Sequence, residues 1–166
     1  EENITAYIYG VSGIGKTELI VRYLKQKKYQ MFDAGRVSAE ELEGIAESEK
    51  RKIVVIDNLH DLAMEEECED IKEAIISLIE REDVWLILSG RCAVPPWLAA
   101  VRYREVFYVI EESELLFDEA QVNQYIEYTK ILLTPEQRKV SKNYCFGFPL
   151  GWYITWDVYE QIRLRE

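Results

Sequence analysis

Apolar residues fall into five short runs along the first two thirds of the chain, with polar and charged stretches between them. The runs are rich in β-branched and aromatic residues, and they predict strands over 4–9, 29–33, 53–57, 84–89 and 105–110. Between these runs apolar residues recur at helical spacing, which predicts helices over 15–27, 39–48, 67–81 and 97–101. Beyond Leu115 the helical period takes over. We therefore expect an α/β unit followed by a helical unit.

Two of the expected strands, 53–57 and 84–89, are apolar at nearly every position instead of alternating with polar residues. Such runs are typical of strands that are buried on both faces, as in a parallel sheet covered by helices. The helix expected over 67–81 carries one apolar stripe, which would pack on such a sheet. The interpretation is a mainly parallel sheet flanked by helices.

Helix start and stop signals organise the last third of the chain. Asp118 can cap one helix, and Thr134 with Gln137 forms the capping box of a second. Gly147 can end that second helix, and Pro149 can open a third that runs to the chain end. These signals predict a small all-helical subdomain.

The change of pattern places a domain boundary between residues 1–111 and 112–166. Because the chain opens close to a core strand and stops inside an expected helix, we expect it to be a piece of a longer protein.

Of its 166 residues, 48% are hydrophobic, which is enough for a folded core. Its net charge of −11 lacks the basic footprint of a nucleic-acid binder, so we expect no direct nucleic-acid contact.

The three cysteines are too far apart to suggest a disulfide framework or a zinc site. No apolar run is long enough to span a membrane, and the charged N-terminus does not resemble a signal peptide. We expect no membrane contact and a cytoplasmic location.

The stretch around residues 7–17 carries the most specific motif, G-x-x-x-x-G-K-[ST], at the point where an expected strand runs into an expected helix. Glycines allow the backbone to bend so that successive N–H groups reach phosphate oxygens, and the helix N-terminus adds its dipole. Lys16 is expected to contact the β- and γ-phosphates, and Thr17 to hold a magnesium ion. The predicted nucleotide-binding residues of this P-loop are Gly10, Ser12, Gly13, Ile14, Gly15, Lys16, Thr17 and Glu18.

Two later strand ends carry polar residues that suit a phosphate site. Asp57 ends an apolar run in the Walker B pattern, and ligands of open α/β sheets bind at the carboxyl ends of strands, so Asp57 is expected to order the magnesium ion with Thr17. Arg91 follows the next strand and is expected beside the γ-phosphate. For His60, the only histidine, two interpretations stay open: a partly exposed side chain, or a hydrogen-bonding role near the phosphates.

In this order the motifs resemble those of STAND-class P-loop ATPases, and among them the MalT-like, large ATP-binding LuxR-type transcriptional regulators. Residues 56–60 look like the D-D-x-H Walker B of that family, 88–98 like its sensor-1 arginine with trailing prolines, 115–119 like its L-x-F entry to the helical subdomain, and 147–149 like its G-x-P motif. The resemblance implies a P-loop NTPase with five strands in the order 5-1-4-3-2. It also implies ATP or ADP with Mg²⁺ as cofactors, and an adenine contact at Pro149.

The same resemblance implies partners: the C-terminal domains of the longer protein, and a second copy in nucleotide-dependent self-association. Two features depart from the family: the region between the second and third expected strands is short, and Asn58 stands where a second acid is usual. An amide is a much weaker base than a carboxylate, so we expect slow hydrolysis, with Asp57, Asn58 and Arg91 at the reacting phosphate and a gain in rate for Asn58→Asp.

The favoured hypothesis is an ATP- or ADP-binding switch module of a larger regulatory protein, such as a transcriptional regulator. The alternative is a turnover P-loop ATPase or a small-molecule kinase, for which the sequence shows no arginine-rich lid. A scaffold with a degenerate P-loop is disfavoured because Gly15, Lys16 and Thr17 are intact.

Overall fold

The computed structural model describes residues 5–45, 50–63, 68–103, 107–130, 133–145, 147–149 and 151. The chain divides into two compact units, one of Glu1–Val11 with Lys16–Glu112 and one of Ser12–Gly15 with Ser113–Glu166. The predicted division into a nucleotide-binding domain, 1–111, and a helical subdomain, 112–166, stays a prediction.

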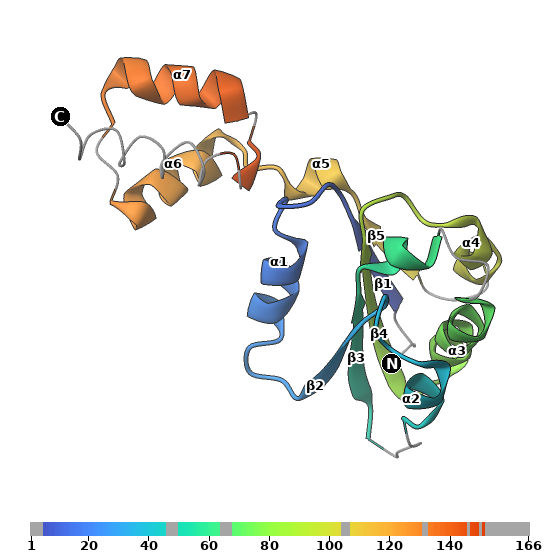
Figure 1. Ribbon diagram of the computed structural model, residues 1–166. Coiled ribbons are helices and arrows are strands. Elements are labelled where there is room, and N and C mark those ends of the chain that lie inside the picture. Colours follow the sequence, from blue (N-terminus) through green and yellow to red (C-terminus); the bar gives the residue numbers. More distant parts are fainter. Residues whose placement is uncertain are drawn as a thin grey trace. The chain divides into compact units, whose positions relative to one another are not determined.

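A five-stranded sheet forms the centre of the first unit (Figure 1). Its strands are β1 (Thr5–Tyr9), β2 (Tyr29–Asp33), β3 (Lys52–Asp57), β4 (Val84–Gly90) and β5 (Phe107–Ile110). The strands lie in the order β2-β3-β4-β1-β5, and every neighbouring pair is parallel. The predicted fold class and the predicted order 5-1-4-3-2 are therefore confirmed. Parallel pairing brings the carboxyl ends of all five strands to one edge of the sheet.

Helices cover both faces of this sheet (Figure 1). On one face lies α1 (Lys16–Tyr23), and on the other lie α2 (Ala39–Glu43), α3 (Glu69–Glu80) and α4 (Pro96–Arg102). A short 3₁₀ helix, η1 (Leu59–Ala63), follows β3 directly. The two central strands are consequently buried on both faces, as their continuous apolar sequences predict.

The core of the first unit is built mainly from β3, β4 and α3. Val54, Val55 and Ile56 of β3 are 0% exposed, and α3 buries the apolar stripe that contains Ile75 and Ile79. Tight apolar packing of this kind holds the carboxyl ends of β3 and β4 in fixed positions.

Two helices end earlier than the sequence predicts. The α1 helix ends at Tyr23 and not at residue 27, because the chain continues in turns such as the one in which Lys27 N donates to Leu24 O at 2.8 Å. The α2 helix begins with the predicted capping box but ends at Glu43, where Gly44 N donates back to Glu40 O at 2.8 Å. The remainder of its predicted range, 46–48, lies outside the described residues.

The helical segment contains α5 (Glu112–Leu115), α6 (Glu119–Thr129) and α7 (Pro135–Cys145). Both predicted caps are present, because Gln121 N donates to Asp118 Oδ1 at 2.8 Å and Gln137 N donates to Thr134 Oγ1 at 3.2 Å. Most of the predicted third helix, 152–166, lies outside the described residues.

A small apolar core holds these helices together. It consists of Val122 and Ile126 of α6 with Cys145 of α7, and Phe117, Tyr125 and Leu133 pack against it.

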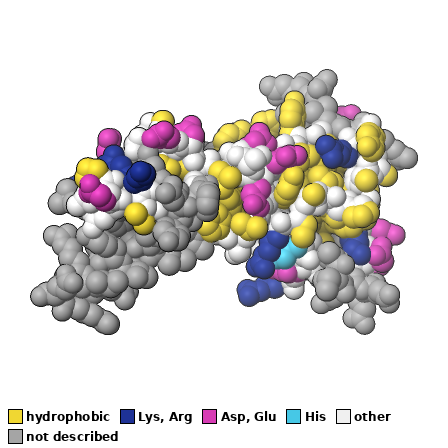
Figure 2. Space-filling model, turned by 90° about the horizontal axis from the view of Figure 1, so that it is seen from above, with side chains coloured by type: hydrophobic (Ala, Val, Ile, Leu, Met, Phe, Trp, Pro, Cys, Tyr) yellow, Lys and Arg dark blue, Asp and Glu magenta, His cyan; other side chains and the backbone are white. Residues whose placement is uncertain are grey.

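The surface of the first unit carries several apolar side chains of α1. Leu19, Val21 and Tyr23 are 42%, 39% and 61% exposed. On the face drawn in Figure 2, acidic and basic side chains are interspersed among apolar ones, and a group of dark-blue Lys or Arg side chains lies beside the cyan histidine. Within the described part of the chain, no helix combines the length and apolarity needed to cross a bilayer.

Gly147 closes a turn that the helical unit depends on, so we expect Gly147→Ala to destabilise the protein. Its φ is +79°, and an added Cβ would lie 2.4 Å from Phe117 O. In addition, Phe117 N donates to Gly147 O at 2.8 Å. A non-glycine residue in this backbone region costs about 1–2 kcal/mol before any clash is counted. Thermal unfolding would measure the loss.

Gly151→Ala is the matched control for this prediction, because the nearest atom to its added Cβ is 3.4 Å away and its backbone is helical. Alanine is favoured over glycine in helices by about 0.8–1.0 kcal/mol, so this variant should unfold at or above the wild-type temperature. Equal melting temperatures for the Gly147 and Gly151 variants would contradict the assignment of the turn.

Candidate nucleotide-binding site

The P-loop joins the end of β1 to the start of α1. Gly13 and Gly15 have φ values of +82° and +100°, which L-residues rarely adopt, and α1 begins at the next residue, Lys16. At the first position of the loop, Gly10 N donates to Gly90 O of β4 at 3.3 Å. The loop therefore has the backbone that its motif predicts, and the N-terminus of α1 follows it.

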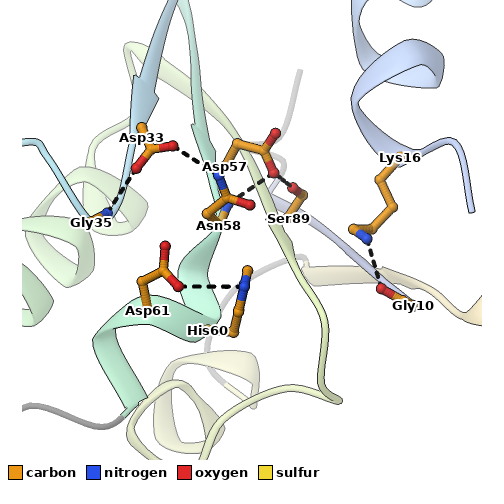
Figure 3. Close-up of polar contacts among 9 residues, drawn as sticks. All are labelled: Gly10, Lys16, Asp33, Gly35, Asp57, Asn58, His60, Asp61 and Ser89. Carbon is orange, nitrogen blue, oxygen red and sulfur yellow. Dashed lines mark hydrogen bonds and ion pairs between the residues drawn. The ribbon is translucent and has the colours of Figure 1, made fainter. Parts of the chain in front are cut away.

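Lys16 reaches back across this loop (Figure 3). Its Nζ donates to Gly10 O at 2.6 Å and to Val11 O at 3.1 Å. Burial lowers the pKa of the ammonium, the Arg91 charge lowers it further, and the charges of Asp57 and Glu112 act in the opposite direction. A phosphate in the loop would supply the counter-charge that this partly buried cation needs.

Asp57, at the end of β3, receives hydrogen bonds from three segments of the chain. Thr17 Oγ1, in the first turn of α1, donates to Asp57 Oδ2 at 2.8 Å. Asp57 Oδ1 accepts from Ser89 Oγ of β4 and from Asn58 N at 2.8 Å. The carboxylate is 8% exposed, so its orientation is fixed by these donors.

Thr17 and Asp57 fit a magnesium site because a hydroxyl and a carboxylate oxygen are ligand types that Mg²⁺ prefers, and here they lie 2.8 Å apart. The ion would neutralise charge on the β- and γ-phosphate oxygens when it is bound with the nucleotide. Ser89 was not among the predicted site residues. Its position at the end of the next strand was the available signal.

Arg91 follows β4 and is exposed. It shares the edge of the sheet with Lys16, since its charge lowers the pKa of Lys16. The segment that carries Arg91 is held by Tyr7 of β1, whose hydroxyl donates to Cys92 O at 2.8 Å. Burial, together with Cys92 and Tyr9, raises the pKa of Tyr7 to about 12, so the hydroxyl remains a donor. A Cβ at Gly90 would lie 2.7 Å from this hydroxyl, so glycine is what allows the close approach.

Asn58, which follows Asp57, also contacts a second acid, Asp33. Its backbone has a φ of +62°, and its Nδ2 donates to Asp33 Oδ2 at 2.8 Å (Figure 3). Asp33 ends β2, and its other oxygen accepts from Gly35 N at 3.1 Å. Sequence reasoning missed Asp33, although it ends its strand in the same way as Asp57 does.

His60 lies on η1, next to this cluster. Its Nε2 is 3.4 Å from Asp61 Oδ1, and its side chain is 16% exposed. Within the described residues its buried Nδ1 has no hydrogen-bond partner. The imidazole is therefore placed against Asp61, and its predicted role near the phosphates stays a prediction.

Three other predicted residues lie away from the Asp57 cluster or belong to the second unit. Glu18 forms an ion pair with Arg22 on the exposed side of α1. Ile14 is 2% exposed and belongs, with Pro149, to the second unit. The adenine contact of Pro149 stays a prediction.

One acidic contact at the loop was not predicted. Glu112 Oε2 accepts from Val11 N at 2.8 Å, across 101 residues of sequence. The start of α5 is thus tied to the P-loop, on the residue that follows Gly10.

No family model and no curated protein matches this sequence. Several solved structures are similar to this chain. One of them is a RuvB variant of Thermotoga maritima, which superposes with a TM-score of 0.60 and is 16% identical in sequence; the match covers 87% of this chain and 50% of the RuvB chain. A STAND protein of Pyrococcus horikoshii with a tetratricopeptide repeat sensor has a TM-score of 0.59 and 16% identity, over 90% of this chain and 26% of that one.

AMPPCP-bound DnaA from Aquifex aeolicus has a TM-score of 0.54 and 18% identity, over 84% of this chain and 50% of that one. RuvB is described as a Holliday junction branch migration motor. The chain thus spans half or less of the length of each of these three proteins. At these identities the likeness concerns the fold, and the chain has the fold of the P-loop ATPases.

Proposed function

We propose that this chain is the nucleotide-binding module of a STAND-type signalling switch, which binds ATP or ADP with Mg²⁺ and hydrolyses ATP slowly. The observation that carries the proposal is the 2.8 Å hydrogen bond from Thr17 Oγ1 to Asp57 Oδ2. It joins the last residue of the P-loop motif to the Walker B carboxylate, two groups that share a metal ion in nucleotide-binding P-loop proteins.

In this proposal, different residues bind the phosphates and the magnesium ion. The N–H groups of the P-loop and the start of α1 hold the phosphates, and Lys16 adds a positive charge to the β- and γ-phosphates. Arg91, whose charge acts on Lys16, would contact the terminal phosphate. Thr17 and Asp57 would hold the magnesium ion. This set of residues binds and orients the nucleotide, and it contains no strong base next to Asp57 other than the engaged carboxylate of Asp33.

The regulatory part of the proposal rests on the order of the motifs and on Asn58. A chain that resembles MalT-like LuxR-type regulators would couple its nucleotide state to C-terminal domains of the same protein, to a transcriptional output, and to self-association. Contact of Pro149 with the adenine would make the helical unit part of that coupling. The rival hypothesis is a turnover ATPase or small-molecule kinase. The amide at position 58 favours the switch, because slow hydrolysis preserves a signalling state.

Thermal-shift measurements with ATP, ADP and GTP, each with and without Mg²⁺, test this proposal. We expect ATP and ADP to raise the melting temperature and GTP to have a smaller effect, and a ligand at 100 times its Kd stabilises by about 2.7 kcal/mol. Lys16→Ala should abolish the shift because it removes the ammonium that spans the loop. Lys25→Ala, an exposed lysine beyond α1, is the control. Wild-type shifts in the Lys16 variant, or no shift with any nucleotide, would refute the site.

Arg91 is expected to distinguish ATP from ADP, because it follows β4 and its charge acts on Lys16, so it would reach only the terminal phosphate. A hydrogen bond to a charged group contributes about 1.5–3 kcal/mol, so Arg91→Ala should weaken ATP binding about tenfold or more and leave ADP binding nearly unchanged. Calorimetric titration measures both affinities. Arg22→Ala removes the same charge from the last turn of α1 and should change neither. Equal losses for ATP and ADP would show that Arg91 has a structural role.

A further inference from the structure

The carboxyl ends of β2 and β3 bring two acids together beside the proposed γ-phosphate position. Asp33 and Asp57 are direct partners in the parallel pairing of these strands. Two carboxylates in adjacent register positions repel each other unless donors lie between them. Asn58 supplies both donors: its N–H donates to Asp57 Oδ1 at 2.8 Å, and its side-chain Nδ2 donates to Asp33 Oδ2 at 2.8 Å.

The contact with Asp33 also fixes which way round the Asn58 amide lies. An ionised carboxylate only accepts hydrogen bonds, so the NH₂ end of the amide faces Asp33 and the Oδ1 end faces away from it. Asp33 is itself held by Gly35 N, and the β2–β3 connection is closed by Ala34 N donating to Asp57 O at 2.8 Å. The direction in which the Asn58 amide oxygen points is thus determined by Asp33 on the neighbouring strand β2, and not by Asn58 alone.

We propose that Asp33 is the positioning residue for Asn58: it accepts from Nδ2, so that the amide presents Oδ1 and not its NH₂ end on the side away from Asp33. This inference rests on the proposed ATP-binding function. Asp33 would not touch the nucleotide; it acts through Asn58, whose Oδ1 can orient the attacking water. The carboxylate that could activate this water is present in the cluster, but it stands on β2 and is engaged by the amide.

The pair changes what the Asn58→Asp variant should do. A carboxylate at position 58 would meet Asp33 where a hydrogen bond of 2.8 Å now stands, and it would also lie beside Asp57. Two carboxylates can hydrogen-bond there only by sharing one proton: either the acid at position 58 holds it and is no base, or Asp33 holds it and donates to the ionised acid at position 58, whose basicity that bond reduces. The single substitution should therefore gain little, in contrast to the expectation from sequence alone.

Exchanging Asp33 and Asn58 restores the hydrogen bond with the donor and the acceptor exchanged. In the double variant Asp33→Asn/Asn58→Asp, the amide on β2 donates to the acid at position 58, which is then an ionised base beside Asp57. General-base assistance is worth about 10²- to 10⁴-fold, so this variant should hydrolyse ATP at least about 100-fold faster than wild type. Aspartate tolerates the φ of +62° at position 58 nearly as well as asparagine, so the backbone is retained.

Single-turnover hydrolysis of Mg²⁺-ATP by wild type, the two single variants and the double variant tests the proposal, with ATP affinity measured by calorimetry on each protein. Asp33→Asn alone should stay near the wild-type rate, and Asn58→Asp alone should stay within about tenfold of it. Asp70→Asn removes one charge from the exposed first turn of α3, a different element from those that carry Asp33, Asp57 and Asn58, and is the control. It should leave the rate unchanged.

The rates and affinities distinguish a failure of the role proposed for Asp33 from a failure of the proposed ATP-binding function. If Asn58→Asp alone is as fast as the double variant, Asp33 does not position residue 58 and the inference is overturned. The same holds if all variants bind ATP and the double variant is no faster than wild type. If wild type does not bind ATP, the proposed function fails, and this inference fails with it.

Discussion

The carboxylate of Asp57 is the point on which the geometry of the site depends. It accepts hydrogen bonds from Thr17 of α1, from Ser89 of β4 and from the N–H of Asn58, and it is nearly fully buried. These donors connect the P-loop helix to the two central strands of the sheet. The packing of β3 and β4 in the apolar core fixes the ends of both strands, so the positions of the polar groups at these ends are set by the fold.

The same edge of the sheet collects more negative charge than a phosphate site easily tolerates. Asp33 lies beside Asp57 in register, and Glu112 bonds to the P-loop at Val11 N. Asn58 reduces the repulsion between the first two by donating to both. Lys16 and Arg91 stand at this edge as well, and burial together with Arg91 lowers the pKa of Lys16. These two cations offset part of the negative charge of the acids at this edge.

The sequence was sufficient for features that depend on local pattern. The apolar run ending in Asp57 predicted a central strand, and Ser38, Asp118 and Thr134 predicted helix caps that the structure contains. The parallel order of strands came from the resemblance and is confirmed. The early end of α1 had no local signal, because apolar residues at helical spacing continue to Leu24.

Contacts between strand ends could not be predicted in the same way. The Asn58–Asp33 bond depends on the register of β2 against β3, and a shift of one residue would remove it. The bond from Val11 N to Glu112 closes over 101 residues and needs the position of β5 beside β1. The local sequence around these residues predicts neither of the two hydrogen bonds, because each joins segments that are far apart in the chain.

The Mg²⁺ dependence of ATP affinity, compared between wild type and Asp57→Asn by calorimetry, tests the central claim most directly. The account predicts that Mg²⁺ strengthens ATP binding to the wild type and that the variant loses most of this gain while it still binds ATP in the presence of a chelator, because Lys16 and the P-loop remain. Nucleotide-free thermal unfolding would show that the variant is folded. An unchanged Mg²⁺ effect in folded Asp57→Asn would contradict the role assigned to this carboxylate.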